Sequence, residues 1–285
     1  MTQPIGRVAI VGLGLMGGSL ARALAARDVT VLGYDSAPGT LDAAEGEGIV
    51  HERLDARLTG VSSADVLVLA LPVNATIATL ARIGGQLGSA RLVMDVGSTK
   101  ASIVGAAESA GLGERFVGAH PLTGSHRSGW RASRANLFDE ARVFLCPASG
   151  ASGDVVRLAE SFWRGLRAGV EILDASEHDG QMAWRSHLPH VLSSALALTL
   201  REAGIHRSAL GPGGRDMTRL AGGAPGMWTP IVEDNVAALL SALDGMDVQL
   251  AAFRAVLARG ASREIHEYFA RGVDWFDGAP IEARL

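Results

Sequence analysis

A group of polar side chains follows an apolar run in the stretch FVGAHPLTGSHRSGW, residues 116–130. The run ends at His120, and Thr123, Ser125 and His126 come soon after it. Histidine has an ordinary pKa close to neutral pH, so His120 is a candidate general base that takes a proton from a substrate hydroxyl. The alternative is a structural histidine whose ring is hydrogen-bonded by backbone groups at the end of a strand.

Three glycines, Gly12, Gly14 and Gly17, form the pattern G-x-G-x-x-G between a short apolar run and a helical stretch. In a dinucleotide-binding loop the first glycine permits a tight turn, the second lets the backbone approach a pyrophosphate, and the third permits close packing of helix on strand. Asp35 ends the next predicted strand, where a carboxylate binds a ribose 2′-hydroxyl. The alternative is a glycine-rich turn in an α/β domain that binds no nucleotide.

The predicted cofactor site also includes Leu15 and Met16, which lie inside the glycine-rich motif, and Pro72, which ends the apolar run of residues 65–72. The carboxylate of Asp35 would repel a 2′-phosphate, and no lysine or arginine follows it closely. We therefore expect NAD rather than NADP as the cofactor.

Ser98 lies in MDVGSTK, residues 94–100, where a predicted strand ends and a helix begins. Open α/β sheets bind ligands at the carboxyl ends of their strands, so a hydroxyl at this position can face the cofactor. The alternative is that Ser98 or Thr99 only caps the following helix.

The motif SHLPH, residues 186–190, contains His187 and His190, which share a helix face because they are three residues apart. We expect one of them in the core and the other on an anionic substrate. A metal site is not predicted, because no acidic or cysteine cluster completes it.

Two arginines, Arg215 and Arg219, lie four residues apart in GGRDMTRLAGGAPGMW, residues 213–228, with Asp216 between them. A guanidinium that faces a cleft binds a carboxylate bidentately. We expect Arg219 to bind the ligand and Arg215 to be structural. The alternative is a surface ion pair with Asp216.

The elements that position these residues alternate between strand and helix in the first part of the chain. Strands are predicted at residues 7–12, 29–35, 65–72, 91–97, 115–121, 142–147 and 169–173. This alternation indicates a parallel sheet covered by helices. Because the carboxyl ends of parallel strands share one edge, the sheet brings the glycine-rich loop, Ser98 and His120 to the same edge.

After Asp174 the pattern becomes helical. The stretches 181–204 and 227–260 are long and apolar on more than one side, which is typical of buried helices, often packed against another copy of the chain. We therefore predict an α/β fold with two domains. Residues 1–174 form a Rossmann-type domain with a doubly wound, mostly parallel sheet, and residues 175–285 form an all-helical domain for substrate binding and dimerisation.

The composition argues against several classes of protein. The net charge is −4, from 26 basic and 30 acidic side chains without a basic block, so nucleic acid is not an expected partner. The single cysteine, Cys146, cannot form an internal disulfide, which fits a reducing cytoplasm. We see no apolar run of roughly 18 residues and no signal-peptide pattern, so no membrane association is expected.

Taken in order, the motifs GLGLMGGSLA, DVGSTK, GAHPLTGS, SHLPH and GGRDMTRLA resemble the prephenate dehydrogenase family, which includes arogenate and cyclohexadienyl dehydrogenases. The resemblance runs over roughly the whole chain, and the last four motifs are far more specific than the first. It implies an NAD(P)-dependent oxidative decarboxylation in tyrosine biosynthesis, either of prephenate to 4-hydroxyphenylpyruvate or of arogenate to tyrosine. It also implies a homodimer that forms through the helical domain.

The resemblance further implies roles for single residues. His120 matches the catalytic histidine that hydrogen-bonds the ring hydroxyl, and Ser98 matches the serine that assists it near the nicotinamide. Arg219 matches the arginine that binds the substrate carboxylate. The remaining residues of the implied substrate pocket are His190, Ser125, Ser186 and Trp228.

The chain departs from many relatives at Leu122, where they have methionine, and at His126, where they have an acid or an amide. An acid there would attract the ammonium group of arogenate, so His126 favours prephenate. Three alternatives stay open: another acid or imine reductase with a helical dimer domain, a non-catalytic NAD-binding protein, and an enzyme of secondary metabolism that acts on a prephenate-like ring.

Overall fold

The structure, a computed structural model, describes residues 4–84, 87–88, 90–124 and 127–278. Ser125 and His126, both singled out in the sequence, lie outside the described residues. The chain separates into two compact units, residues 1–236 and 237–285. The domain boundary near residue 174 stays a prediction.

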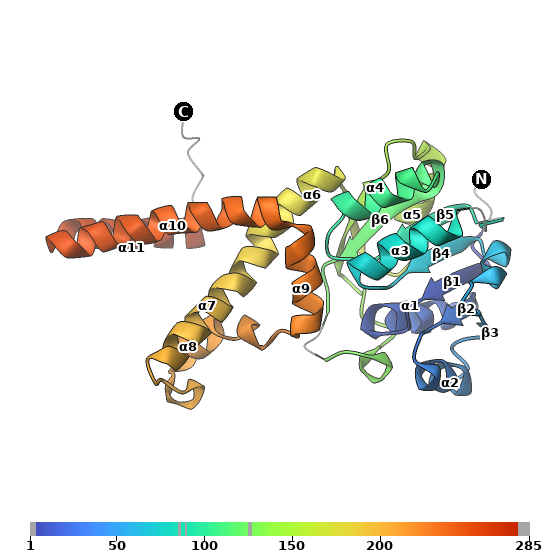
Figure 1. The fold of residues 1–285 in the computed structure, drawn as a ribbon, viewed down its shortest axis with the longest axis horizontal. Coiled ribbons are helices and arrows are strands. Elements are labelled where there is room, and N and C mark those ends of the chain that lie inside the picture. Colours follow the sequence, from blue (N-terminus) through green and yellow to red (C-terminus); the bar gives the residue numbers. More distant parts are fainter. Residues whose placement is uncertain (1–3, 85–86, 89, 125–126, 279–285) are drawn as a thin grey trace. The chain divides into compact units, whose positions relative to one another are not determined.

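The first unit contains an eight-stranded sheet with the strand order β3-β2-β1-β4-β5-β6-β7-β8 (Figure 1). The strands are β1 (Arg7–Val11), β2 (Thr30–Tyr34), β3 (Glu52–Arg53), β4 (Val66–Leu69), β5 (Leu92–Asp95), β6 (Phe116–Pro121), β7 (Arg142–Pro147) and β8 (Gly169–Ile172). Neighbouring strands are parallel except β6 and β7, which are antiparallel. The predicted α/β fold with a mostly parallel, doubly wound sheet is confirmed.

Helices cover both faces of this sheet (Figure 1). One apolar core contains side chains of α1, α2 and α5, and the other contains side chains of α3 and α4. These helices are α1 (Leu15–Ala25), α2 (Pro38–Gly46), α3 (Val73–Ile83), α4 (Ala101–Ser109) and α5 (Gly153–Gly165). Alternate residues of each central strand enter opposite cores, for example Ile10 the first and Val11 the second. The central strands are therefore buried on both faces and appear in the sequence as continuous apolar runs.

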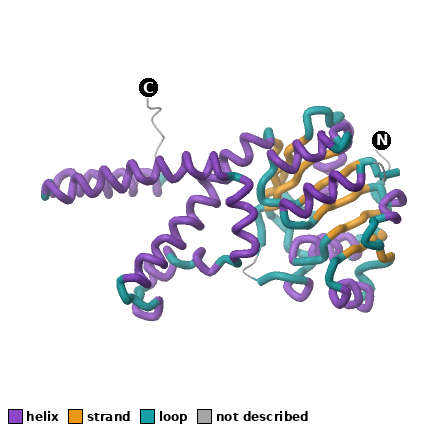
Figure 2. The backbone as a smooth tube through the Cα atoms, viewed as in Figure 1, coloured by secondary structure: helices purple, strands orange, loops and turns teal. Residues whose placement is uncertain are grey.

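The chain is helical after β8 (Figure 2). In the first unit the helices are α6 (Ala175–Met182), α7 (Leu188–Glu202), α8 (Pro212–Met217) and α9 (Pro225–Asp234). A π-helical turn, Ala183–His187, joins α6 to α7. The described part of the second unit consists of α10 (Val236–Arg259), which begins at the junction, and α11 (Ser262–Phe276). Short 3₁₀ turns lie at Thr59–Ser63, Gly113–Arg115, Trp130–Ala132, Arg207–Ala209 and Leu220–Gly222.

The prediction of one uninterrupted helix over residues 227–260 is wrong at Asn235. This residue ends α9 with φ −124° and ψ 36°. Its side-chain amide donates to the carbonyl oxygen of Asp179 at 2.8 Å and lies 3.2 Å from Nδ1 of His187. Asparagine side chains compete with helix continuation by forming such hydrogen bonds, so the chain turns here and starts a new helix.

The expectation that no apolar run is long enough to cross a membrane is wrong for α10. By length and composition this helix could cross a membrane. Its most apolar 18-residue segment has a mean hydropathy of 1.4, and 11% of that segment is buried within the chain. One helix of this kind is weak evidence for a membrane protein, because helices that pack against other protein surfaces are also long and apolar. Its exposed apolar side chains therefore need another explanation.

Candidate active site

The loop between β1 and α1 packs tightly against the backbone around it. Gly12 has φ +93°, and a Cβ at this position would lie 2.4 Å from the carbonyl oxygen of Ala70. A Cβ on Gly17 would lie 1.8 Å from the carbonyl oxygen of Gly12. Glycine is therefore required at both positions, by backbone conformation in the first case and by close approach in both.

Gly14 differs from these two glycines, because a Cβ there would meet no protein atom within 4 Å. It is the N-cap of α1, which has no side-chain cap and no acidic residue in its first turn. Leu15 and Met16 are the first two residues of this helix and are half-buried. The first amide groups of a helix lack intrahelical partners, so open space beside an uncapped, acid-free N-terminus fits the pyrophosphate of a dinucleotide.

Asp35 follows β2 and holds the glycine-rich loop in place. Its Oδ2 accepts a hydrogen bond from the amide of Leu13 at 2.7 Å, and its Oδ1 accepts one from the amide of Ala37 at 2.8 Å. Each oxygen keeps a second lone pair, so the carboxylate can still accept a ribose hydroxyl. Pro72, assigned to the same cofactor site, is the exposed residue that precedes α3.

His120 lies in β6 and is 9% exposed. Its Nδ1 is 2.9 Å from Nε2 of His178, and Nδ1 of His178 is 2.7 Å from Oδ1 of Asp179. Both partners come from α6 and are buried. The sequence analysis missed them, because an adjacent His-Asp pair in a polar helix resembles any solvated helix face.

Asp179 also binds the N-terminus of α4. Its Oδ1 accepts from the amide of Lys100 and its Oδ2 from the amide of Ala101, both at 2.8 Å. A carboxylate at this place is stabilised by the helix dipole and by the free amides of the first turn. The alternative that Ser98 or Thr99 caps this helix is not borne out, because Asp179 takes that role from another element.

Lys100 and Asp95 form an ion pair that is fully buried under β6. The Lys100 ammonium donates to Oδ2 of Asp95, which also accepts from the amide of Gly97 at 2.7 Å. A Cβ on Gly118 of β6 would lie 3.0 Å from Cδ of Lys100, so the strand lies directly on the pair. Burial raises the pKa of Asp95, and the charge of Lys100 opposes that rise.

His120 is kept neutral by its surroundings. Burial lowers the pKa of its imidazole well below the ordinary 6.5, and His178, Lys100 and His187 lower it further. A neutral imidazole whose second nitrogen is unprotonated is a proton acceptor. The arrangement can therefore take a proton from a hydroxyl placed at this edge of the sheet.

Ser98 is half-buried between β5 and α4, and its hydroxyl forms no hydrogen bond with any described residue. Its neighbour Thr99 is buried with an unpartnered Oγ1. In the described part of the chain no group of three or more His, Cys, Asp or Glu side chains is placed to hold a metal ion.

A second set of predicted residues comes together on α7 and α9. The rings of His190 and Trp228 lie 3.7 Å apart between centroids, tilted by 32°. Nδ1 of His190 is 3.0 Å from the carbonyl oxygen of Ser186, which lies in the π-helical turn. Burial lowers the pKa of His190, and nearby Arg219 also lowers it.

His187 lies between the group formed by His120, His178 and Asp179 and the pair formed by His190 and Trp228. It is 1% exposed, bonded to Asn235, and burial lowers its pKa to about 4. Asn235 links it to Asp179 and so to the His178–His120 contact, and Trp228 packs against both His187 and His190, so the structure brings His120 and His190 into one region. His187 is the core member of the pair and His190 the half-buried one.

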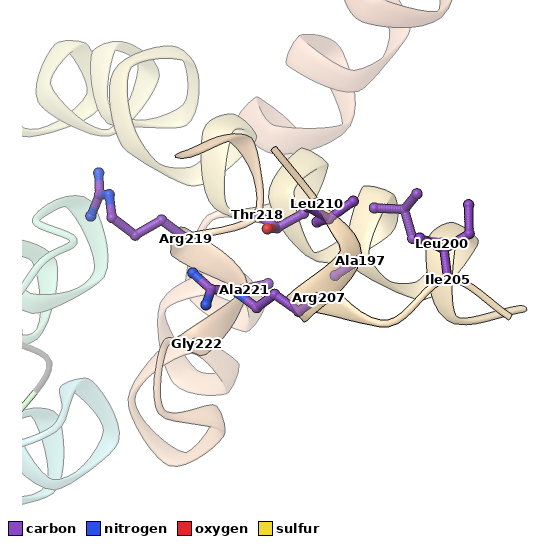
Figure 3. A pocket seen from close by; sticks show the side chains of 9 residues that line it. All are labelled: Ala197, Leu200, Ile205, Arg207, Leu210, Thr218, Arg219, Ala221 and Gly222. Carbon is purple, nitrogen blue, oxygen red and sulfur yellow. The ribbon is translucent and has the colours of Figure 1, made fainter. Parts of the chain in front are cut away.

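Arg219 is exposed at the start of the turn Leu220–Gly222 and lines a cavity of about 360 Å³. Its guanidinium points away from the apolar end of that cavity, which Leu200 and Ile205 form (Figure 3). Arg215 donates from Nε to the carbonyl oxygen of Leu210 at 2.8 Å. Among the described residues it makes no ion pair with Asp216.

The chain matches two family models. The model "Prephenate dehydrogenase, nucleotide-binding domain" matches residues 20–172, and "Prephenate dehydrogenase, dimerization domain" matches residues 174–271. A prephenate dehydrogenase of Bacillus subtilis (strain 168) is 30% identical over 294 residues, covering 100% of this chain and 79% of that protein. A cyclohexadienyl dehydrogenase of Zymomonas mobilis is 30% identical over 271 residues, covering 92% of each chain.

A solved structure with a similar fold is that of prephenate dehydrogenase from A. aeolicus in complex with hydroxyphenyl propionate and NAD+. It has a TM-score of 0.89 and 29% identity to this chain, and the likeness covers 97% of this chain and 99% of that one.

Proposed function

Because this chain belongs to the prephenate dehydrogenase family, we propose that it converts prephenate to 4-hydroxyphenylpyruvate by oxidative decarboxylation. It is an NAD-dependent oxidoreductase with a Rossmann-type nucleotide domain. The observation that carries the substrate proposal is His120, buried at the sheet edge with its Nδ1 2.9 Å from Nε2 of His178, with the His190–Trp228 pair in the same region.

The chemistry follows from these groups. When bound on the glycine-rich loop, NAD supplies the acceptor for a hydride. His120 takes the proton of the ring hydroxyl, which lets the carbon that bears it lose a hydride and become a carbonyl carbon. The ring carboxylate then leaves as carbon dioxide, its electron pair restores the aromatic ring, and the former carbonyl oxygen takes back the proton held by His120. Neither a metal nor a Schiff-base lysine is required for this loss of carbon dioxide.

The substrate is a dianion, so its site needs cationic and hydrogen-bonding groups. We assign Arg219 to a substrate carboxylate, because a guanidinium binds carboxylate bidentately and remains charged. We assign Ser98 to the region of the nicotinamide. The proposed pocket is completed by His190, Ser186, Trp228 and, outside the described residues, Ser125.

We propose a homodimer that forms through the helical part of the chain, which carries the dimerisation-domain match. The proposal is supported by large exposed apolar side chains on α10 and α11. We further propose a domain boundary near residue 174, between the two matched regions, and a cytoplasmic enzyme, for which the single buried Cys146 is suited.

The test is to mix the purified protein with NAD and either prephenate or arogenate and to follow reduced nicotinamide. We expect reduction with prephenate and release of 4-hydroxyphenylpyruvate. A higher kcat/KM with arogenate would overturn the substrate assignment while keeping the reaction class. No reduction with either compound, despite NAD binding, would contradict the proposed function itself.

A further inference from the structure

Behind His120 lies a chain of three side chains that ends in a buried carboxylate. We infer that His178, oriented by Asp179, is a positioning residue that holds His120 as its Nδ1–H tautomer, so that the unprotonated Nε2 faces the substrate hydroxyl. The inference deepens the proposed function and rests on it only for the identity of the hydroxyl.

The positions of the protons follow from what each group can donate. An ionised carboxylate only accepts hydrogen bonds, so at 2.7 Å from Oδ1 of Asp179 the Nδ1 of His178 must carry a hydrogen. A neutral His178 then has an acceptor at Nε2. The 2.9 Å contact to His120 therefore requires a hydrogen on Nδ1 of His120, which makes Nε2 the basic nitrogen.

The opposite arrangement conflicts with the other contacts of Asp179. It would need either a hydrogen on Asp179, or a second hydrogen on His178, which would place a positive charge on a fully buried ring. Oδ1 of Asp179 already faces the amide of Lys100, and Oδ2 faces the amide of Ala101. These amides and the N-terminus of α4 stabilise the negative charge, so the carboxylate stays an acceptor.

The ring of His178 is also fixed by packing. It is fully buried and lies edge-on to His120, with centroids 5.1 Å apart and planes at 74°. The ring of Phe144 also lies edge-on to His178, with centroids 5.5 Å apart and planes at 73°. Phe144 is the register partner of His120 in the β6–β7 pair, so the sheet holds these two rings side by side against His178 of α6.

Among the described residues, the other titratable and charged groups around His120 do not provide a second orienting partner. Lys100 and Asp95 are paired with each other, and His187 bonds to Asn235. Cys146 on β7 is a buried thiol whose pKa burial raises to about 12. Asp179 is therefore the carboxylate that balances the positive charge His120 acquires when it takes the substrate proton.

The first test needs no substrate and no substitution at His178. Histidine labelled with ¹⁵N reports which ring nitrogen is protonated, and His120→Asn identifies the signals of His120 among the eight histidines. We expect a neutral His120 with protonated Nδ1 and unprotonated Nε2 near neutral pH. A neutral His120 with protonated Nε2 would overturn the inference, whatever the enzyme proves to oxidise.

The second test separates the hydrogen bond from the packing of the ring. His178→Phe keeps an aromatic ring but removes the acceptor, so we expect mixed tautomers of His120 and a kcat lower by about tenfold or more, with KM nearly unchanged. His178→Gln returns an acceptor oxygen and should restore most of the Nδ1–H tautomer and of kcat. Phe144→Leu is the packing control and should leave the tautomer of His120 unchanged.

The variants also provide results that contradict the inference. If His178→Phe keeps the wild-type tautomer and kcat, His178 does not orient His120. If His178→Phe and His178→Gln lower kcat equally while the tautomer of His120 stays fixed, the role of His178 is structural. Should neither substrate react at all, the spectra of the wild type and of the Gln variant still decide the tautomer, separately from the proposed function.

Discussion

At the scale of single residues, the reaction depends most directly on His120. Asparagine at this position keeps a polar side chain of similar reach but cannot take a proton at neutral pH. For His120→Asn we expect kcat to fall by about 10²–10⁴-fold, the usual effect of removing an acid–base group. Steady-state kinetics with prephenate and NAD measures the loss. An unchanged affinity for NAD and an unchanged melting temperature serve as the folding control, and a kcat near the wild-type value would remove His120 from the mechanism.

The pH dependence of the reaction follows from the burial of His120. The base acts only when neutral, and burial lowers its pKa well below 6.5. We therefore expect kcat/KM, which reports the free enzyme, to stay constant as the pH falls to 6.5 and to decline only at lower pH. A pH profile of kcat/KM checks this. A decline centred at 6.5 or above would mean that the imidazole is hydrated, not desolvated.

The sequence predicted part of the candidate site and missed part of it. His120 and the glycines are found because their neighbours along the chain, a strand end and a strand–helix turn, identify them. His178 and Asp179 are not, because the contact with His120 joins residues 58 positions apart and forms only when α6 reaches the sheet edge. The catalytic, substrate-binding and cofactor-binding roles assigned from the sequence, including those of Arg219, Ser98 and Ser125, stay predictions.

At the scale of elements, α1 and the loop before it perform two separable tasks. A methyl group on Gly14 meets no protein atom within 4 Å, whereas one on Gly17 would lie 1.8 Å from a backbone oxygen. We expect Gly14→Ala to keep the melting temperature and to weaken NAD binding by about tenfold or more, because the methyl group enters the space of the pyrophosphate. Calorimetric titration with NAD and thermal unfolding measure the two effects.

Gly17→Ala is the matched comparison, since it adds the same methyl group three residues further on, in the first turn of α1. It must push α1 away from β1, so we expect it to lower the stability by about 1–3 kcal/mol, as overpacked cores do. If Gly14→Ala bound NAD as tightly as the wild type, the pyrophosphate would not lie over this glycine.

Most elements were predictable because burial on both faces gives the central strands continuous apolar sequences. β3 was not, since it has only two residues and both are exposed. The break between α9 and α10 was missed for a different reason. The apolar pattern continues through Asn235, and the turn depends on hydrogen bonds to Asp179 and His187 from distant parts of the chain.

At the scale of the whole molecule, the exposed apolar surface of the second unit needs a partner. Leu240, Val248 and Leu257 of α10 are each more than half exposed, and so are Phe269 and Phe276 of α11. Large apolar side chains exposed together on a soluble protein usually mark an interaction surface. The family match of residues 174–271 to a dimerisation domain gives these helices a partner, a second copy of the chain.

Val248 tests this explanation, because it is 64% exposed on α10 and can be replaced without disturbing the fold of one chain. Val248→Glu would place a charge in the proposed interface, so we expect a dimeric wild type and a variant whose dimer dissociates at least about tenfold more readily. Sedimentation equilibrium measures both masses. Ile172→Glu is the control, since Ile172 is a 48% exposed apolar residue on β8, before the dimerisation match begins. A monomeric wild type, or equal dissociation of both variants, would contradict dimerisation through α10 and reopen the question of what covers its apolar side chains.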